Sequence, residues 1–269
     1  MVESRSASEH YPPVAVVKMA PEVRVKLENN TIVDPPPIFI AEQITEILNS
    51  AHNPRVILLH ADTMYAGKST ALNELARMLP LDSYMAFQPA IAVRNEDQKN
   101  SIIDRNGGRT SVNPLQTNDL GDIVKYLENL DAKPTYVLID ELMLFIGNAD
   151  NHEDAVLAIE AIRGMGMHLV IAGINYTFKG EDFTFMREMA LEVVSNPNWH
   201  HIRMQTLCNC GRPAKVSARL VWRGGVSCLA SYSDGDFLAS DEYAPRCNEE
   251  GHVGCTGHPN GNIMDKWPI

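Results

Sequence analysis

The stretch that decides the fold runs from His60 to Leu75 and reads HADTMYAGKSTALNEL. An apolar run, RVILLHA (55–61), leads into it and predicts a buried strand, while the residues from Lys68 to about Leu79 have helical spacing. A loop between a strand and a helix start directs backbone N–H groups at an anion, and the helix dipole favours the negative charge. The sequence therefore predicts a phosphate-binding loop (P-loop), formed by Met64, Tyr65, Ala66, Gly67, Lys68, Ser69 and Thr70.

The first position of this loop is unusual, because Asp62 stands where the P-loop pattern begins with glycine. A carboxylate beside phosphates is repelled unless it turns away, and we therefore expect Asp62 to point outward. We expect Lys68 to reach the terminal phosphates of ATP and the Ser69 hydroxyl to ligate Mg²⁺. The alternative is a chance Gly-Lys-Ser triplet in a loop that binds no phosphate.

The chain downstream of the loop alternates between apolar runs and amphipathic segments. The strand candidates are SYMAFQP (83–89), TYVLIDELMLF (135–145) and MHLVIAG (167–173). The helix candidates are DLGDIVKYLENL (119–130) and HEDAVLAIEAIRGM (152–165). Apolar strands separated by amphipathic helices are typical of a parallel sheet that is covered on both faces. The sequence therefore predicts an α/β fold, with a P-loop parallel sheet and helices on both faces.

Two adjacent carboxylates, Asp140 and Glu141, end the apolar run in YVLIDE. Ligands of open α/β sheets bind at the carboxyl ends of the strands, which is where these side chains are expected. Asp140 suits an outer-sphere contact to Mg²⁺, and Glu141 suits a base that takes a proton from a hydroxyl. The alternative is a pair of solvated carboxylates, which the preceding P-loop makes less attractive.

Composition limits the classes of partner. The 269 residues include 45% hydrophobic residues, and the net charge is −11. Broad contact with a nucleic-acid backbone requires clustered Lys and Arg, so we expect no nucleic-acid partner. No apolar run approaches the roughly 18 residues of a membrane helix, and MVESRSASEH at the amino terminus lacks the layout of a secretory signal. We therefore expect a cytoplasmic protein with no membrane partner.

The last third of the chain contains a cluster of potential metal ligands. All five cysteines lie there together with His252 and His258, and four of them are candidate ligands: Cys208, Cys210, Cys247 and Cys255. In a cytosolic chain this clustering favours metal binding over disulfides. We predict a structural Zn²⁺ site formed by Cys208, Cys210, Cys247 and His252, with Cys255 as the rival fourth ligand. The alternative is a set of unconnected buried thiols.

The sequence pattern divides the chain into three parts. Prolines interrupt the first 53 residues, where only IAEQITEILNSA (40–51) has helical spacing, and we interpret 1–53 as an irregular extension. The alternation of strands and helices defines a nucleotide-binding core over 54–200. From 201 to 269, short β-like runs, glycines and the Cys/His cluster predict a small β-rich domain that holds the Zn²⁺.

The order of five segments resembles the thymidine kinases of the zinc-containing, tetrameric type. These are the P-loop, IDE, AGINYTFKGEDF (172–183), CNCGRPAKVSARL (208–220) and YAPRC (243–247), and the resemblance spans Val56 to Cys247. It implies a kinase that transfers the γ-phosphate of ATP to the 5′-hydroxyl of thymidine or a related 5-substituted deoxyuridine, and that assembles as a homotetramer.

The resemblance also implies roles for individual residues. Glu141 matches the base that acts on the 5′-hydroxyl, and Arg94 is expected to face the phosphates. The residues matching those that enclose the pyrimidine are Met64, Phe178 and Phe183. Tyr243 matches a tyrosine of a lasso-like loop, held by the zinc domain, whose backbone reads the base.

Several positions depart from the family pattern. Ala92 stands where the family has an aspartate, Met143 and Leu144 replace a glutamine and an aromatic residue, and Glu250 replaces a Cys or His. Two other hypotheses therefore stay open at this point. One is a P-loop ATPase or switch whose zinc tail docks a partner, and the other is a non-catalytic homologue that binds nucleotide.

Overall fold

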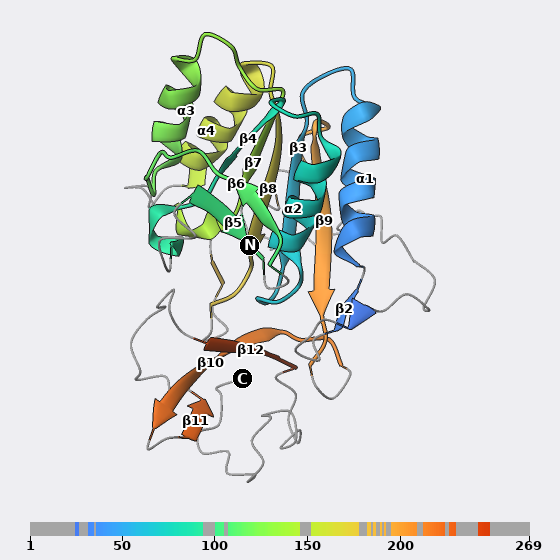
Figure 1. The fold of residues 1–269 in the computed structure, drawn as a ribbon, viewed down its shortest axis with the longest axis vertical. Helices are drawn as coiled ribbons and strands as arrows, with labels where there is room; N and C mark the ends of the chain where they lie inside the picture. The colour runs from blue at the N-terminus through green and yellow to red at the C-terminus, as the bar shows by residue number, and fades with distance from the viewer. Residues whose placement is uncertain are drawn as a thin grey trace, which may run out of the picture.

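The computed structural model describes residues 25–26, 32–34, 36–93, 100–104, 107–145, 152–177, 182–183, 185–186, 189, 191, 195–208, 212–223, 226–229 and 242–247. Their main element is a seven-stranded sheet in the order β1-β2-β9-β3-β8-β7-β4 (Figure 1). Five of the strands are parallel, namely β3 (Val56–Ala61), β4 (Tyr84–Phe87), β7 (Tyr136–Ile139), β8 (His168–Ile174) and β9 (Trp199–Thr206). The short strands β1 (Val25–Lys26) and β2 (Ile32–Asp34) add an antiparallel edge next to β9.

Helices cover both faces of this sheet, as the sequence predicts. On one face lie α1 (Pro37–Asn49) and α2 (Lys68–Met78), and on the other lie α3 (Leu120–Glu128) and α4 (His152–Gly164) (Figure 1). Successive residues of β3 alternate between the two cores: Ile57 packs with the α1 and α2 side chains, and Leu58 with those of α3 and α4. All six residues of β3 are buried, which explains why its sequence is a continuous apolar run.

Besides β1 and β2, two longer elements extend the sheet domain beyond the range 54–200 expected from sequence. Helix α1 precedes that range and packs against α2 through buried side chains that include Ile40 and Ile44. Strand β9 continues to Thr206 and pairs in parallel with β3 along its whole length. The sequence of β9, WHHIRMQT, places two histidines and an arginine in a strand with a partly polar face, so its hydrophobicity did not identify it.

Two smaller sheets complete the described architecture. The hairpin β5 (Ser101–Ile103) and β6 (Arg109–Ser111) lies against α2, where Asn73 Nδ2 donates to Asp104 Oδ2 and to the Gly108 carbonyl oxygen, both at 3.0 Å. A three-stranded antiparallel sheet has the order β11-β10-β12. Its strands are β10 (Val216–Arg223), β11 (Val226–Leu229) and β12 (Glu242–Arg246). This sheet is the β-rich part expected after residue 200.

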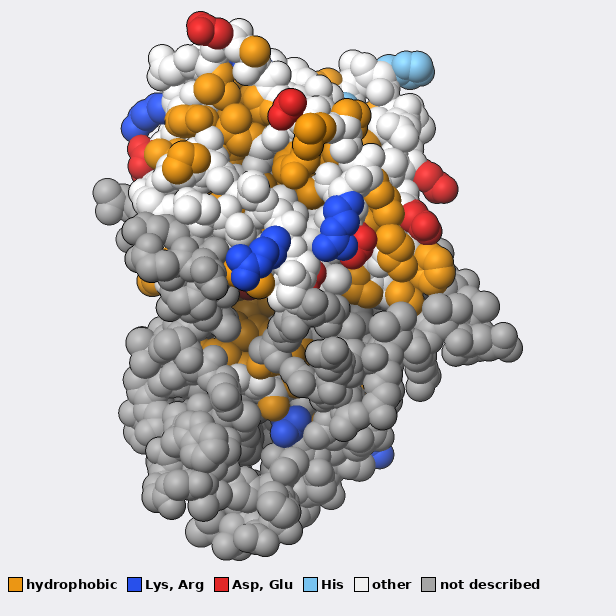
Figure 2. Space-filling view, in the orientation of Figure 1, with side chains coloured by type: hydrophobic (Ala, Val, Ile, Leu, Met, Phe, Trp, Pro, Cys, Tyr) orange, Lys and Arg blue, Asp and Glu red, His pale blue; other side chains and the backbone are white. Residues whose placement is uncertain are grey.

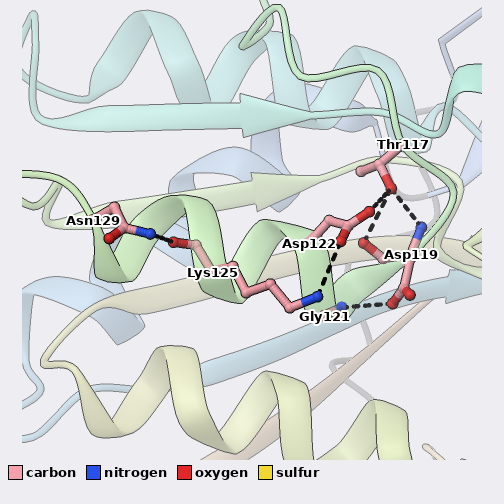
Figure 3. Close-up of polar contacts among 6 residues, drawn as sticks. All are labelled: Thr117, Asp119, Gly121, Asp122, Lys125 and Asn129. Atoms are coloured by element: carbon pink, nitrogen blue, oxygen red, sulfur yellow. Dashed lines mark hydrogen bonds and ion pairs between the residues drawn. The ribbon is translucent and has the colours of Figure 1, made fainter.

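A network of polar contacts defines the start of α3 (Figure 3). Asp119 caps the helix by accepting a hydrogen bond from the Gly121 N–H (2.7 Å), and Thr117 Oγ1 donates to Asp122 Oδ2 (2.8 Å). The Thr117 carbonyl oxygen also accepts from the Ala90 N–H (2.9 Å), and Asn118 Oδ1 accepts from the Ile91 N–H (3.0 Å). The start of α3 thereby fixes the short 3₁₀ helix η1 (Ala90–Ala92), which follows β4.

The surface of the helical part is mixed in character. Figure 2 shows hydrophobic side chains interspersed with charged ones over this face. The exposed large hydrophobic residues come from separate elements and loops: Ile38, Met78, Leu81, Ile91, Leu157 and Leu191. Among the described residues, the helices are all too short or too polar to span a bilayer.

Candidate active site

The predicted P-loop directly connects β3 to α2. The residue before the helix, Gly67, has φ 79° and ψ 16°, a left-handed conformation that suits glycine because it has no Cβ. Tyr65 also has a positive φ of 68°, which is uncommon for a residue with a side chain. The loop therefore has the tight backbone path that directs N–H groups toward a bound anion at a helix start.

Lys68, Ser69 and Asp140 meet where β3 and β7 end. Lys68 is buried, and its Nζ donates to the Thr63 carbonyl oxygen at 3.5 Å. The Ser69 hydroxyl donates to Asp140 Oδ2 at 2.7 Å. A cation, a hydroxyl and a carboxylate are therefore assembled at the carboxyl edge of the parallel sheet, where ligands of such sheets bind.

Burial sets the electrostatics of this group. It lowers the pKa of Lys68, and the nearby carboxylates of Glu141 and Asp140 act in the opposite direction. Burial raises the pKa of Asp140, against the opposing effects of the Ser69 hydroxyl, the Lys68 ammonium and the Glu141 N–H. Desolvated charges interact strongly with a ligand, because little water screens them.

Glu141 follows directly after this cluster. Its backbone N–H donates to Asp140 Oδ1 at 3.0 Å, and its φ of 52° is in the left-handed region. A residue other than glycine pays roughly 1–2 kcal/mol for this conformation, and such backbone strain concentrates at functional sites. Asp140 is hydrogen-bonded to Ser69, and both carboxylates, Glu141 more than Asp140, counteract the lowering of the Lys68 pKa by burial.

The Asp62 carboxylate interacts with residues outside the group formed by Lys68, Ser69 and Asp140. Its Oδ1 accepts a hydrogen bond from Asn175 Nδ2 at 2.8 Å, and its Oδ2 forms an ion pair with Arg203. Asn175 follows β8, and Arg203 lies on β9. The carboxylate that the sequence places at the first P-loop position is therefore held by the two strands that flank β3.

An apolar cluster lies next to the carboxylates. It is part of the hydrophobic core on the α3 and α4 face of the sheet and contains three of the four residues expected to bind the nucleoside: Met64 and Tyr243 are buried in it, and Phe183 packs against it. Leu144 belongs to the same cluster and is 6% exposed. The cluster thus includes side chains from the P-loop, from the segment after β7 and from β12. Phe178 and Arg94 lie outside the described residues.

One hydrogen bond joins the P-loop to the small sheet. The Met64 N–H donates to Ser217 Oγ at 2.7 Å, and both residues are buried. Ser217 lies on β10 opposite Pro245 of β12, the strand that contains Tyr243. The contact therefore connects the loop to the sheet that positions Tyr243.

The predicted Zn²⁺ ligands fall partly within the described residues. Cys208 and Cys247 are both buried and form a small cluster of their own. The other predicted ligands, Cys210, His252 and Cys255, lie outside the described residues. Within the described part of the chain, Cys, His, Asp and Glu side chains form no group of three that could hold a metal ion. The Zn²⁺ site therefore stays a prediction.

Sequence reasoning missed the polar residues that support the site. Asn175 follows the carboxyl end of a parallel strand, and this position could have marked it as a site residue. Arg203 belongs to a strand that was not recognised, and Ser217 has no local signal because its partner is a backbone N–H 153 residues away.

Comparisons with known proteins complete the description of the site. Residues 55–250, more than half of the chain, match the family model described as thymidine kinase. The thymidine kinase of Thermococcus kodakarensis is 26% identical over 163 residues, which cover 59% of this chain and 75% of that protein. Among solved structures, the flagellar accessory protein FlaH from Methanocaldococcus jannaschii is similar over 83% of this chain and 98% of that one, with 11% identity and a TM-score of 0.37.

Proposed function

The chain belongs to the thymidine kinase family, and we propose that it transfers the γ-phosphoryl group of ATP to the 5′-hydroxyl of thymidine or of a related 5-substituted deoxyuridine. Membership of the family makes the chain a nucleoside kinase, with a nucleotide and a deoxynucleoside as substrates. The identity of each substrate and the roles of the residues are part of the proposal.

The observation that carries the proposal is the assembly of Lys68, Ser69, Asp140 and Glu141 beside an apolar cluster. Phosphoryl transfer requires little covalent chemistry from the protein, and its catalysis is mostly positioning and charge stabilisation. A P-loop backbone, a buried ammonium and a carboxylate at one edge of a sheet meet both requirements.

Glu141 is the proposed base. Its carboxylate would accept the proton of the nucleoside 5′-hydroxyl as that oxygen attacks the γ-phosphorus, while the bond from phosphorus to the leaving oxygen of ADP breaks. Lys68 would offset the charge of the phosphates, and the N–H groups of the loop would orient them. Arg94, if it faces the phosphates, adds a second cation.

The residues present fit a Mg²⁺ ion bound with ATP. The Ser69 hydroxyl and the buried Asp140 carboxylate are hard oxygen donors that already contact one another. They would hold the ion, Ser69 directly and Asp140 from the outer sphere. When bound, Mg²⁺ would neutralise charge on the phosphate oxygens.

The apolar cluster supports a pyrimidine substrate. Met64, Phe183 and Tyr243 would enclose the base together with Phe178, while backbone groups of the loop before Tyr243 would read its edge. Flat apolar walls exclude a purine by size, and main-chain donors and acceptors distinguish one base edge from another.

The decisive assay is γ-phosphoryl transfer from labelled ATP to each of the four deoxynucleosides. We expect transfer to thymidine and 5-substituted deoxyuridines, and no transfer to deoxyadenosine or deoxyguanosine. Transfer to purines at an equal rate would contradict the assigned base pocket. ATP hydrolysis at a rate that does not depend on any added nucleoside would favour the ATPase or switch. Nucleotide binding with no turnover would favour a non-catalytic homologue.

A structural Zn²⁺ and a homotetramer are further parts of the proposal. Two buried cysteines side by side, Cys208 and Cys247, fit half of a tetrahedral thiolate site. Metal analysis should find about one Zn²⁺ per chain, and Cys247→Ser should lose it. Cys228→Ser is the matched control, because Cys228 is the cysteine outside the proposed ligand set. A wild-type chain without bound metal would leave only buried thiols. Light scattering tests the assembly.

A further inference from the structure

Asp62 lies at the end of a hydrogen-bonded chain that runs across three strands. Its Oδ1 accepts from Asn175 Nδ2 (2.8 Å), and Asn175 Oδ1 lies 2.8 Å from His60 Nδ1. The second nitrogen of His60, Nε2, is hydrogen-bonded to Nε2 of His201. Arg203 completes the group by pairing with Asp62 Oδ2. The first residue of the P-loop is therefore tied to β3, β8 and β9.

The directions of these hydrogen bonds follow from the carboxylate. Because Asp62 can only accept, Asn175 donates to it through Nδ2 and presents Oδ1 to His60. His60 must then carry its proton on Nδ1, which leaves Nε2 to accept from His201. Each side chain in this series therefore donates a hydrogen bond to the next one in the direction of Asp62. The Asn175 backbone N–H adds a bond to the Ala61 carbonyl oxygen (2.8 Å), immediately before the loop.

We propose that Arg203 and Asn175 are positioning residues of the P-loop, which hold the Asp62 carboxylate and offset its charge so that a polyphosphate can bind in a loop that begins with an acid. This inference depends on one part of the proposed function, namely that the loop binds ATP. A glycine at this position would need no such partners. The Arg203–Asp62 ion pair exists because this sequence has an aspartate where the P-loop pattern has a glycine.

Charge balance gives the expected effects. Without Arg203, the Asp62 carboxylate would face the phosphates uncompensated, so Arg203→Gln should weaken Mg·ATP binding by about ten-fold. Asp62→Asn should strengthen binding severalfold, because Arg203 then acts on the phosphates alone. In the double variant, both charges are absent, and binding should return to within about two-fold of wild type.

The measurement is the Kd of Mg·ATP on the full chain, by titration calorimetry without any nucleoside. Arg77→Gln is the matched control: the Arg77 side chain is 52% exposed against 54% for Arg203, and it forms its own ion pair with Glu74 in the last turn of α2. It should not change the Kd. A double variant that binds as weakly as Arg203→Gln would overturn the proposal, and so would weaker binding by Asp62→Asn alone.

The dependence of the Kd on salt distinguishes an electrostatic role of Arg203 from a purely structural one. Raising the ionic strength from about 0.05 M to about 0.5 M shortens the Debye length from roughly 14 Å to roughly 4 Å. The ratio of Kd values between Arg203→Gln and wild type should therefore shrink at high salt. A ratio that stays constant would indicate distorted structure and contradict the proposal. A chain that binds ATP but phosphorylates no nucleoside would refute the proposed function and leave this test intact.

Discussion

The P-loop side and the small-sheet side of the candidate site are built differently. The P-loop side is fixed by many contacts among β3, β7, β8, β9 and α2, and its charged groups are buried between them. The small sheet reaches the loop through the bond between Ser217 and Met64 and through Tyr243 in the apolar cluster. In the proposed function, the P-loop side would carry the phosphoryl transfer, and the small sheet would hold the nucleoside.

Glu141→Gln tests the P-loop side and has the largest expected effect. It removes the proposed base while nearly preserving the volume, so turnover should fall by about 10²-fold or more with ATP and nucleoside affinities retained. Single-turnover kinetics separate the chemical step from binding. Glu42→Gln, at an exposed position of α1, is the matched control and should have no effect. A transfer rate close to wild type would remove Glu141 from the mechanism.

Ser217→Ala tests the junction between the two sides. It leaves the buried Met64 N–H without its acceptor, which costs roughly 1–3 kcal/mol for a buried polar group. We expect kcat/KM for the nucleoside to fall by about ten-fold, with a smaller change in ATP affinity. Ser217→Thr retains the hydroxyl and should restore most of the activity. If Ser217→Ala weakens ATP and nucleoside binding equally, the division between the two sides is wrong.

The difference between the two sides also explains how much of the fold and of the site could be predicted from the sequence. The strands and helices of the P-loop side follow from periodicity, because each buried residue of β3 contributes to a two-faced core. The strand–loop–helix pattern predicts the positions of Lys68 and Ser69, the end of a second apolar run predicts that of Asp140, and the structure joins Ser69 to Asp140. Ser217 and Arg203 could not be found in this way, because their partners, Met64 and Asp62, lie in the P-loop far away in the sequence, and only tertiary pairing brings them together.

The pH dependence of stability sharpens the account of the P-loop side. Burial, followed by the effect of His201, lowers the pKa of His60 to about 3, whereas the unfolded chain has the ordinary value of 6.5. Between these values the unfolded state binds one more proton than the native state. Stability therefore falls as the pH is lowered, by about 1.4 kcal/mol per pH unit from this residue.

Denaturant unfolding between pH 7 and about pH 5 measures this slope. His60→Gln should flatten the slope by up to about 1.4 kcal/mol per pH unit below pH 6.5, whatever its effect on absolute stability. His52→Gln, at an exposed position outside this hydrogen-bonded group, is the matched control substitution. The lowered pKa values of His201 and His168 contribute to the same trend in every variant. An unchanged slope in His60→Gln would mean that the imidazole titrates normally.

The smallest expected effect concerns the apolar cluster that both sides share. Leu144 is buried there with Met64 and Tyr243, at a position where the family pattern has an aromatic residue. A leucine wall is shorter than an aromatic one, so in the proposed pocket it would leave room for a 5-substituent larger than methyl. The pocket should therefore discriminate weakly among 5-substituted deoxyuridines, by roughly ten-fold per group.

Leu144→Phe should shift this preference toward thymidine. The larger ring occupies the space next to the 5-position, so kcat/KM for bulky analogues should fall several-fold more than kcat/KM for thymidine. Met64 and Met143 lie in the same cluster, and their flexible side chains can absorb part of the added volume. Leu157→Phe, on the exposed side of α4, controls for the substitution itself and should leave the ratio of the two values unchanged. Because the readout is a ratio between two nucleosides, a general loss of stability cancels. An unchanged ratio in Leu144→Phe would therefore mean that the 5-substituent does not lie next to Leu144. The small sheet would then set the largest 5-substituent that the pocket accepts.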